Sequence, residues 1–346
     1  MVPQPSPNGN DERERSPGSV ELTGSGDLTT LRRTGAVMRG TVGRQRVRRM
    51  GRLALLVAVP LIASACSSGG SNPNPSSNSP KATLAPGQPH LYWGNDSGSS
   101  VGAANIDGTG AIPDFIGGQL RPCGVAVDET YVYWANEDDT TIGRAKLDGS
   151  EVDERFISGA NAPCGVAVDA SHIYWGNAGL TMGRSGTTIG RANLDGTGVD
   201  QHFITGANGP TAVAVDAQYV YWANWSGGTI GRANIDGTGV DQHFIGTQTR
   251  PQGVAVDGTY IYWASGDAIG RANLDGSGPK QSFIKGASGP CGIAVTSTYL
   301  YWGNIGPFPS EDGTTIGRAN LDGSGANESL ISGATGPCGV AVEASG

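Results

Sequence analysis

Residues 210–245 read PTAVAVDAQYVYWANWSGGTIGRANIDGTGVDQHFI, and variants of this stretch recur along the chain. Its aromatic-Trp motif occurs six times, at spacings of 41, 41, 47, 41 and 39 residues. The tryptophans of this motif are Trp93, Trp134, Trp175, Trp222, Trp263 and Trp302. Self-similarity at a nearly fixed period is the mark of a repeat architecture, so we interpret the repeated unit before any single residue.

Each unit contains four short segments that are typical of β-strands. VAV, YVYW and the start of TIG are rich in strand formers, and Gly, Asn and Asp separate them. YVYW and GVAV show no polar alternation, which indicates strands that are buried on both faces. An Asp-Gly pair between the third and fourth segments predicts a tight hairpin. Four antiparallel strands in one unit predict one blade of a β-propeller.

The repeat region begins and ends at different segments of the unit. It begins with a second segment, HLYWGN from His90, and ends with a first segment, GVAV, just before Glu343. The last strand can therefore complete the blade that the first strands begin, which removes an exposed sheet edge. We predict an all-β fold for residues 89–346: a six-bladed β-propeller closed by pairing of the C-terminal strand with the N-terminal blade.

The repeated phrase YVYWAN followed by TIGRANLDGTG resembles the YWTD, or class B, repeat of low-density-lipoprotein-receptor-type propellers. All six units share the resemblance, which implies a six-bladed ring. The family's Thr-Asp is replaced by Ala-Asn or Gly-Asn, while its Arg is kept in five units as Arg144, Arg191, Arg232, Arg271 and Arg318. The phrase PCGVAVD is also similar to virginiamycin B lyase and gluconolactonase-like propellers, which implies an alternative enzymatic role.

Composition and charge exclude some functions. Of 346 residues, 57 are Gly, and the formal net charge is −8. From Pro89 onward the chain has 26 acidic and 12 basic residues, so this part has a formal net charge of −14. Such an acidic body would repel phosphate backbones, so we exclude nucleic acid as a partner.

The N-terminal part predicts export. We divide it into a basic, non-globular extension over residues 1–49, a signal-peptide apolar region over 50–65 and a Ser/Gly/Pro/Asn tether over 66–88. The apolar run is too short to cross a bilayer as a helix. ASAC, ending at Cys66, resembles a bacterial lipobox, which implies lipid attachment to that cysteine. We therefore expect an exported, membrane-anchored lipoprotein that contacts the membrane only through its lipid, with simple cleavage as the alternative.

Four cysteines occupy one repeat position just before the innermost strand. They are Cys123, Cys164, Cys291 and Cys338. In ring order they are consecutive, so neighbours close to the axis can come within the Cα separation of about 7 Å that a disulfide tolerates. We favour the pairs Cys123–Cys164 and Cys291–Cys338, with free buried thiols or a metal site as alternatives.

Carboxylates end five of the six innermost strands. They are Asp128, Asp169, Asp216, Asp257 and Glu343, with Thr296 in the sixth. A ring of carboxylates could bind a hard divalent cation at one channel mouth. We favour the alternative, in which each accepts hydrogen bonds from its own turn. None of the four histidines is placed by its register in the channel, and we assign no catalytic residue and no required cofactor.

The connections after the YW motif vary most between units, and variation points to a binding surface. The candidate residues on these connections are Asp138, Asp139, Trp225, Phe308, Glu311 and Asp312. The leading hypothesis is a non-catalytic module that binds an extracellular protein, glycan or wall ligand. The alternative is a secreted metal-dependent lyase or lactonase, which needs at least three convergent polar groups in the channel. A third hypothesis, a structural spacer, requires no patch on either face.

The lipobox-like segment makes one prediction about the mature chain. Cleavage before Cys66 should leave this residue at the N-terminus with a mass increase from attached acyl chains. Mass spectrometry of the N-terminal peptide from membrane fractions measures this directly. A mature chain that starts at another, unmodified residue would exclude the lipid anchor.

Overall fold

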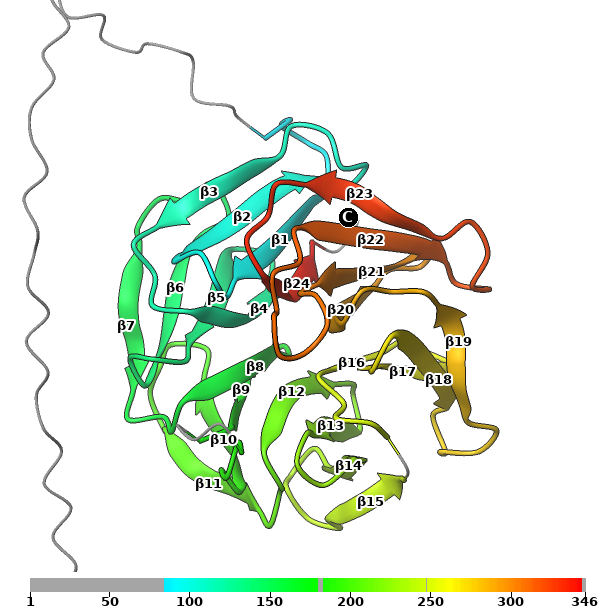
Figure 1. The fold of residues 1–346 in the computed structure, drawn as a ribbon. Coiled ribbons are helices and arrows are strands. Elements are labelled where there is room, and N and C mark those ends of the chain that lie inside the picture. Colours follow the sequence, from blue (N-terminus) through cyan, green and yellow to red (C-terminus); the bar gives the residue numbers. More distant parts are fainter. Residues whose placement is uncertain (1–83, 180–182, 247, 344–346) are drawn as a thin grey trace, which may run out of the picture. The chain divides into compact units, whose positions relative to one another are not determined.

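Six four-stranded antiparallel sheets make up the described part of the computed structural model, which covers residues 84–179, 183–246 and 248–343. The sheets surround a common axis as the blades of a propeller (Figure 1). The predicted all-β, six-bladed fold is confirmed. Residues 1–83 lie outside this range, and with them the expected extension, signal region and Cys66. Among the described residues there is no helix with the length and hydropathy to cross a membrane.

The strands follow the four repeated segments. The innermost strands carry the VAV segment: β4 (Pro122–Val127), β8 (Pro163–Val168), β12 (Pro210–Val215), β16 (Gly253–Val256), β20 (Pro290–Val295) and β24 (Pro337–Val342). The second strands carry the YW motif: β1 (His90–Asn95), β5 (Tyr131–Asn136), β9 (His172–Asn177), β13 (Tyr219–Asn224), β17 (Tyr260–Ser265) and β21 (Tyr299–Asn304).

The two outer positions of each blade are filled by the remaining segments. The third strands are β2 (Ser100–Asn105), β6 (Thr141–Lys146), β10 (Thr188–Asn193), β14 (Thr229–Asn234), β18 (Ala268–Asn273) and β22 (Thr315–Asn320). The outermost strands are β3 (Ile112–Gly117), β7 (Asp153–Ser158), β11 (Asp200–Thr205), β15 (Asp241–Ile245), β19 (Lys280–Lys285) and β23 (Asn327–Ser332).

The ring is closed by the last strand. β24 pairs antiparallel with β1 in the order β24-β1-β2-β3, with Trp93 opposite Val340. This confirms the predicted closure. The body also extends slightly before residue 89, because Leu84 packs against a core cluster and the Ala85 amide donates to Asn105. The end of the expected tether therefore belongs to the folded body.

The core lies between neighbouring blades. The tryptophan of every YW motif is fully buried, and each core cluster joins residues of adjacent sheets. The conserved spacing between Trp222 and Gly231 has a steric reason, because the two residues face each other on β13 and β14. A Cβ on Gly231 would overlap the indole ring of Trp222. The same Gly-Trp contact recurs in all six blades of the described body.

The neutral Asn that replaces the family's Asp joins three segments of a blade. The Asn224 side-chain amide donates to Thr229 Oγ1 at 3.1 Å and to the Gln242 carbonyl at 3.2 Å. Its oxygen accepts from the Asn208 amide at 2.8 Å. A carboxylate could only accept, so Asn suits this position better than Asp.

The repeated arginine has a scaffolding role as well. The Arg232 guanidinium lies 4.5 Å from the ring centroid of Tyr219 and 3.9 Å from that of Phe244, and it donates to the Leu274 carbonyl of the next blade. The predicted Asp-Gly hairpins join the third and fourth strands, and in them the glycine takes the positive φ, 86° at Gly237.

Gly231→Ala should destabilise the fold, because the added methyl group overlaps a fully buried indole ring. We expect a loss of about 1–3 kcal/mol, the usual cost of overpacking. Urea unfolding followed by tryptophan fluorescence measures the difference. Gly117→Ala is the matched control, since it also lies in a strand and its added Cβ meets nothing within 4 Å. Equal losses in the two variants would contradict the steric role of Gly231.

Candidate functional site

One end of the propeller carries both the variable connections and the segments that lead into the innermost strands. We call it the loop face; it comprises the turns between second and third strands and the links from each outermost strand to the next inner strand. Backbone hydrogen bonds join the two sets, for example from Glu137 N to Arg121 O at 3.2 Å and from Ile305 N to Gly289 O at 3.1 Å. The β21–β22 connection reaches over the centre of the ring in Figure 1.

Two of the predicted binding residues meet on this face. Trp225, on the β13–β14 turn, and Phe308, on the β21–β22 connection, have ring centroids 6.4 Å apart. The Arg250 guanidinium lies 5.0 Å from the Trp225 ring and 4.5 Å from the Phe308 ring. Phe308 is 54% exposed, and it is the most exposed large apolar residue described. We call Trp225, Arg250 and Phe308 the aromatic–arginine patch.

Sequence reasoning missed Arg250, although the repeat contains a signal for it. The residue just before the inner-strand proline has a positive φ in every blade, and three copies use Gly there. Arg250 and Arg121 occupy this position with φ of 47° and 50°. A left-handed backbone is unfavourable for a side chain of this size, which makes such a position a candidate functional site. Comparison of the six copies would have singled out both arginines.

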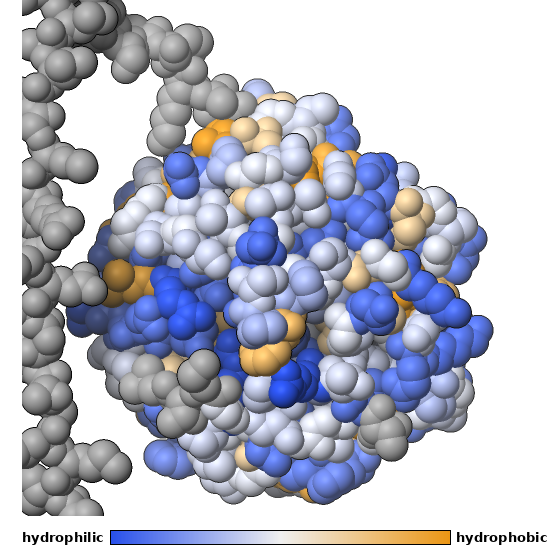
Figure 2. Space-filling model, viewed as in Figure 1, coloured by the Kyte–Doolittle hydropathy of each residue, from blue (hydrophilic) through white to orange (hydrophobic). Residues whose placement is uncertain are grey.

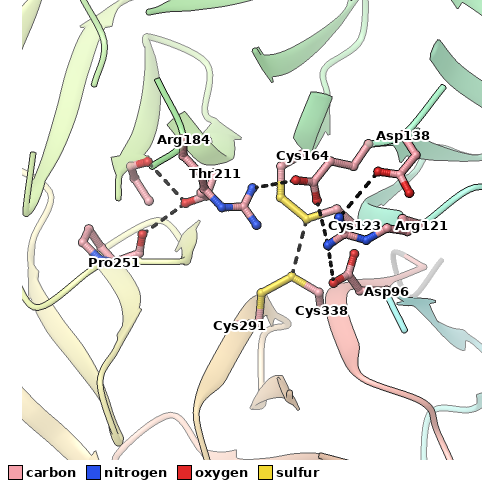
Figure 3. Close-up of a disulfide and its surroundings, with 12 residues drawn as sticks. Asp96, Arg121, Cys123, Asp138, Cys164, Arg184, Thr211, Pro251, Cys291 and Cys338 are labelled. Atoms are coloured by element: carbon pink, nitrogen blue, oxygen red, sulfur yellow. Dashed lines mark hydrogen bonds and ion pairs between the residues drawn. A yellow bond between two sulfur atoms is a disulfide. The ribbon is translucent and has the colours of Figure 1, made fainter. Parts of the chain in front are cut away.

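Arg121 organises a partly buried group of charges near the axis, shown in Figure 3. Its Nη2 lies 3.1 Å from Asp96 and 3.5 Å from Glu137, and its Nη1 lies 3.5 Å from Asp138. Arg184 approaches Glu137 from the β9–β10 connection at 3.4 Å. We call Asp96, Arg121, Glu137, Asp138 and Arg184 the ionic cluster.

The ionic cluster is held in an environment that penalises charge. Asp96 is 5% and Glu137 8% exposed. Burial raises the pKa of the Glu137 carboxyl, although Arg184 and Arg121 oppose this shift. Because a buried charge needs partners, Arg184 and Arg121 together stabilise the ionised form of the Glu137 carboxyl. Of the predicted residues, only Asp138 belongs to this cluster; Asp139 pairs with Arg155 instead, and Asp312 accepts from the Ser310 hydroxyl.

The four cysteines lie together beside the ionic cluster. The structure contains the disulfides Cys123–Cys164 and Cys291–Cys338, with Cα separations of 5.0 and 4.9 Å. The two disulfides are in contact, since Cys123 Sγ lies 3.6 Å from Cys338 Sγ. Ala178 and Ile305, one from each of the two long connections, pack against them.

The central channel is narrow where it passes between the inner strands. Its cavity measures about 40 Å³, space for only a few water molecules. The wall consists of Gly, Ala, Val and Ile backbone and side chains with Cys123, Cys338, Thr211 and Gln252. No His, Asp or Glu is among these described lining residues, so the wall does not provide the three convergent groups that the enzyme hypothesis requires.

The carboxylates at the ends of the inner strands lie at the opposite end of the propeller, where four aspartates support their own turns and Glu343 bonds to β1. Asp128 accepts from the Thr130 and Tyr131 amides at 2.7 Å and from the Tyr133 hydroxyl at 2.8 Å. The equivalent contacts recur at Asp169, Asp216 and Asp257, while Glu343 accepts from His90 and Tyr92. The four aspartates thus make the turn contacts that we favoured, whereas Glu343 joins the closing strand to β1.

Residues 218–257, which include strands β13 to β16, match the low-density lipoprotein receptor repeat class B. The expected resemblance to class B repeat propellers is therefore confirmed. No curated protein matches the chain significantly.

Solved structures share the fold. The nidogen propeller from a nidogen/laminin complex has a TM-score of 0.59 and 19% identity, covering 74% of this chain and 99% of its own. A gluconolactonase from Xanthomonas campestris has a TM-score of 0.52 and 19% identity, covering 63% and 79%. A virginiamycin B lyase from Staphylococcus aureus has a TM-score of 0.49 and 16% identity, covering 70% and 84%. At 19% identity, the similarities to the nidogen structure and to the gluconolactonase show a shared fold alone.

Arg121→Met should destabilise the fold by about 1–2 kcal/mol near pH 8, because it leaves two buried carboxylates with one cation fewer, while water partly screens the 42% exposed Arg121 side chain. Loss of Arg121 also raises the pKa of Glu137 further, so the folded variant binds a proton more readily than the unfolded chain. A carboxyl whose pKa is higher in the folded state than in the unfolded state stabilises the fold at low pH. This contribution is lost as the pH rises through the folded-state pKa. The difference in unfolding free energy between the wild-type chain and the variant should therefore be smaller at pH 5 than at pH 8.

Urea unfolding at both pH values measures this effect. Arg155→Met is the control, because the Arg155 side chain is 67% exposed in its pair with Asp139. It should cost less than about 1 kcal/mol at either pH. If Arg121→Met lowers the unfolding free energy by the same amount at both pH values, the pKa of Glu137 does not depend on Arg121.

Proposed function

We propose that this protein is an extracytoplasmic binding module, anchored by lipid at Cys66, that holds a protein partner on its loop face. Export and anchoring are supported by the leader and the ASAC segment alone. The binding role is supported by the surface of the propeller. The contact of the half-buried Trp225 with the exposed Arg250 and Phe308 is the observation that carries the proposal.

The composition of this patch is typical of protein recognition sites. Trp and Arg are enriched among the residues that contribute most to binding energy, and aromatic rings supply large contact areas. A hollow of about 400 Å³ adjoins the patch and is lined by Arg250, Asp267, Ser288 and Phe308, among others. It has the size to accept a side chain of the partner. Figure 2 shows apolar surface near the centre of this face, bordered by strongly hydrophilic residues.

Several contacts tie the connections of the loop face to one another and to the core. The β9–β10 and β21–β22 connections pack on the disulfides through Ala178 and Ile305, and the Ser226 hydroxyl donates to the Arg184 carbonyl at 3.1 Å. A surface that is already ordered loses less conformational entropy on binding. The nidogen propeller of the same fold was solved in a complex with laminin, which fits a role in protein binding.

The negative charge of the propeller indicates the charge of the surface that a partner presents. Asp138, Glu311 and Asp312 lie on the connections of the loop face, and the part of the chain from Pro89 carries 26 acidic against 12 basic residues. A complementary partner presents an apolar side chain within a basic surface. We do not propose the lyase or lactonase alternative, because its requirement for convergent groups in the channel is not met by the described lining residues.

Photo-crosslinking tests the proposal in cells that produce the full chain. A photoreactive phenylalanine analogue at position 308 should form an adduct with a partner protein. The same analogue at Val199 is the control, because Val199 is 43% exposed on a turn at the opposite end of the propeller. Adducts of the same partner from both positions would contradict a specific loop-face site.

The partner is then titrated against purified variants. Trp225→Ala combined with Phe308→Ala should weaken binding at least tenfold, because interface hot spots each contribute about 2 kcal/mol or more. Val199→Ala combined with Val240→Ala, both exposed at the other end, should leave the affinity unchanged. Unchanged affinity in the Trp225/Phe308 variant would exclude the aromatic–arginine patch as the binding site.

A further inference from the structure

The two disulfides form a single group of four sulfur atoms. They come from four consecutive inner strands, β20, β24, β4 and β8, and all four cysteines are at most 5% exposed. Cys123 Sγ lies 3.6 Å from Cys338 Sγ. The sulfurs of Cys123, Cys164 and Cys338 all lie within 4.8 Å of one another, and Cys291 is bonded to Cys338. The two disulfides therefore form one compact, buried group of sulfur atoms.

Three of the four sulfurs already lie within 4.8 Å of one another, near the sulfur spacing of a tetrathiolate metal site, and Cys291 would move toward them once its bond to Cys338 is reduced. A structural zinc ion binds four thiolates in a tetrahedron with Zn–S distances of about 2.3 Å, which places the sulfurs about 3.8 Å apart. The contact between the two disulfides is already close to this edge length. A four-cysteine set is complete without histidine, so the lack of a nearby histidine does not argue against such a site.

We propose that in the reduced chain Cys123, Cys164, Cys291 and Cys338 bind one zinc ion as a tetrathiolate site, and that zinc and the two disulfides are mutually exclusive states of this centre. Reduction requires two molecules of a dithiol reductant. Each transfers two electrons and two protons to one disulfide and becomes a cyclic disulfide itself, which yields four thiols. Zinc then displaces the four thiol protons as the four Zn–S bonds form.

The surroundings fit this exchange. The channel cavity of about 40 Å³ borders Cys123 and Cys338, which leaves space for the sulfurs to separate. On the other side, Ala178 and Ile305 cover the sulfurs and keep bulk water away. Thiolates bind zinc more strongly than water does in such a closed site, as in structural zinc centres generally.

A second set of possible ligands shares Cys123. Asp96 and Glu137 have carboxylate oxygens within 4.8 Å of the Cys123 sulfur. Both carboxylates are already paired with Arg121, and Glu137 is also paired with Arg184. Nearby cations compete with a metal for these oxygens, so we assign the zinc to the four thiols. The two possibilities differ in their need for Cys291, which belongs to the first set alone.

Zinc alone serves as the probe. The full chain is produced and purified under a dithiol reductant, with and without zinc, and bound metal is measured by atomic spectrometry. The expected result is one zinc per chain, with four thiols that resist alkylation until a chelator removes the metal. Oxidation should release the zinc and leave no reactive thiol among the four. Cobalt in place of zinc should give the absorption bands of a tetrahedral thiolate complex.

Variants identify the ligands. Cys291→Ser should reduce zinc binding at least tenfold, whereas Glu137→Gln should retain one zinc per chain. Cys66→Ser is the matched cysteine control and should also retain it. Zinc binding that survives Cys291→Ser but is lost in Glu137→Gln would overturn the proposal in favour of the carboxylate set. A reduced, folded wild-type chain that binds no zinc would overturn it too.

Circular dichroism accompanies every measurement to establish folding. If reduction unfolds the wild-type chain, added zinc should restore the β-sheet spectrum, because binding free energy at such a site is also folding free energy. A reduced chain that stays unfolded with excess zinc would likewise overturn the proposal. The alkylation assay on the wild-type chain remains decisive even if Cys291→Ser does not fold.

Discussion

The close approach of the inner strands at the propeller axis is the constraint on which the rest of the structure depends. A Cβ on Gly124 would overlap the Cys164 carbonyl, and a Cβ on Gly165 would overlap the backbone of Ala212. Glycine at this position in five of the six inner strands allows the strand backbones to come this near. The ring is consequently narrow, and so is its channel between the inner strands. Each cysteine of the inner strands directly precedes one of these glycines, so the same approach brings the sulfurs together.

The junctions between blades are secured in different ways. Disulfides join β4 to β8 and β20 to β24, while between β12 and β16 the Thr211 hydroxyl donates to the Pro251 carbonyl at 3.1 Å. Thr211 stands where four other units have cysteine, and its hydrogen bond takes over part of the cross-linking role. The closing strand β24 is held twice, by its ladder with β1 and by the covalent bond to β20. Closure therefore does not depend on strand pairing alone.

Repeated residues build the scaffold, and departures from the repeat build the candidate site. Arg232 and its equivalents pack on aromatic rings, and Asn224 and its equivalents join strands within a blade. Arg121 and Arg250 instead take a left-handed backbone where other units have Gly or Ala, and each reaches into a different group on the loop face. Sequence reasoning found Trp225 and Phe308 as separate aromatics, but their contact, and the arginine between them, depend on how distant blades meet.

The sequence by itself determined the number of blades, the four strands of each, the phase of closure and the ring position of the cysteines. These features follow from a period and from local strand and turn preferences, which one unit of the repeat already contains. The tertiary structure decided how wide the ring is, which charges are buried, and which loops touch. Such features depend on side chains that are far apart in the chain, like Trp225 and Phe308 or Cys123 and Cys338, and no local pattern specifies the distance between them.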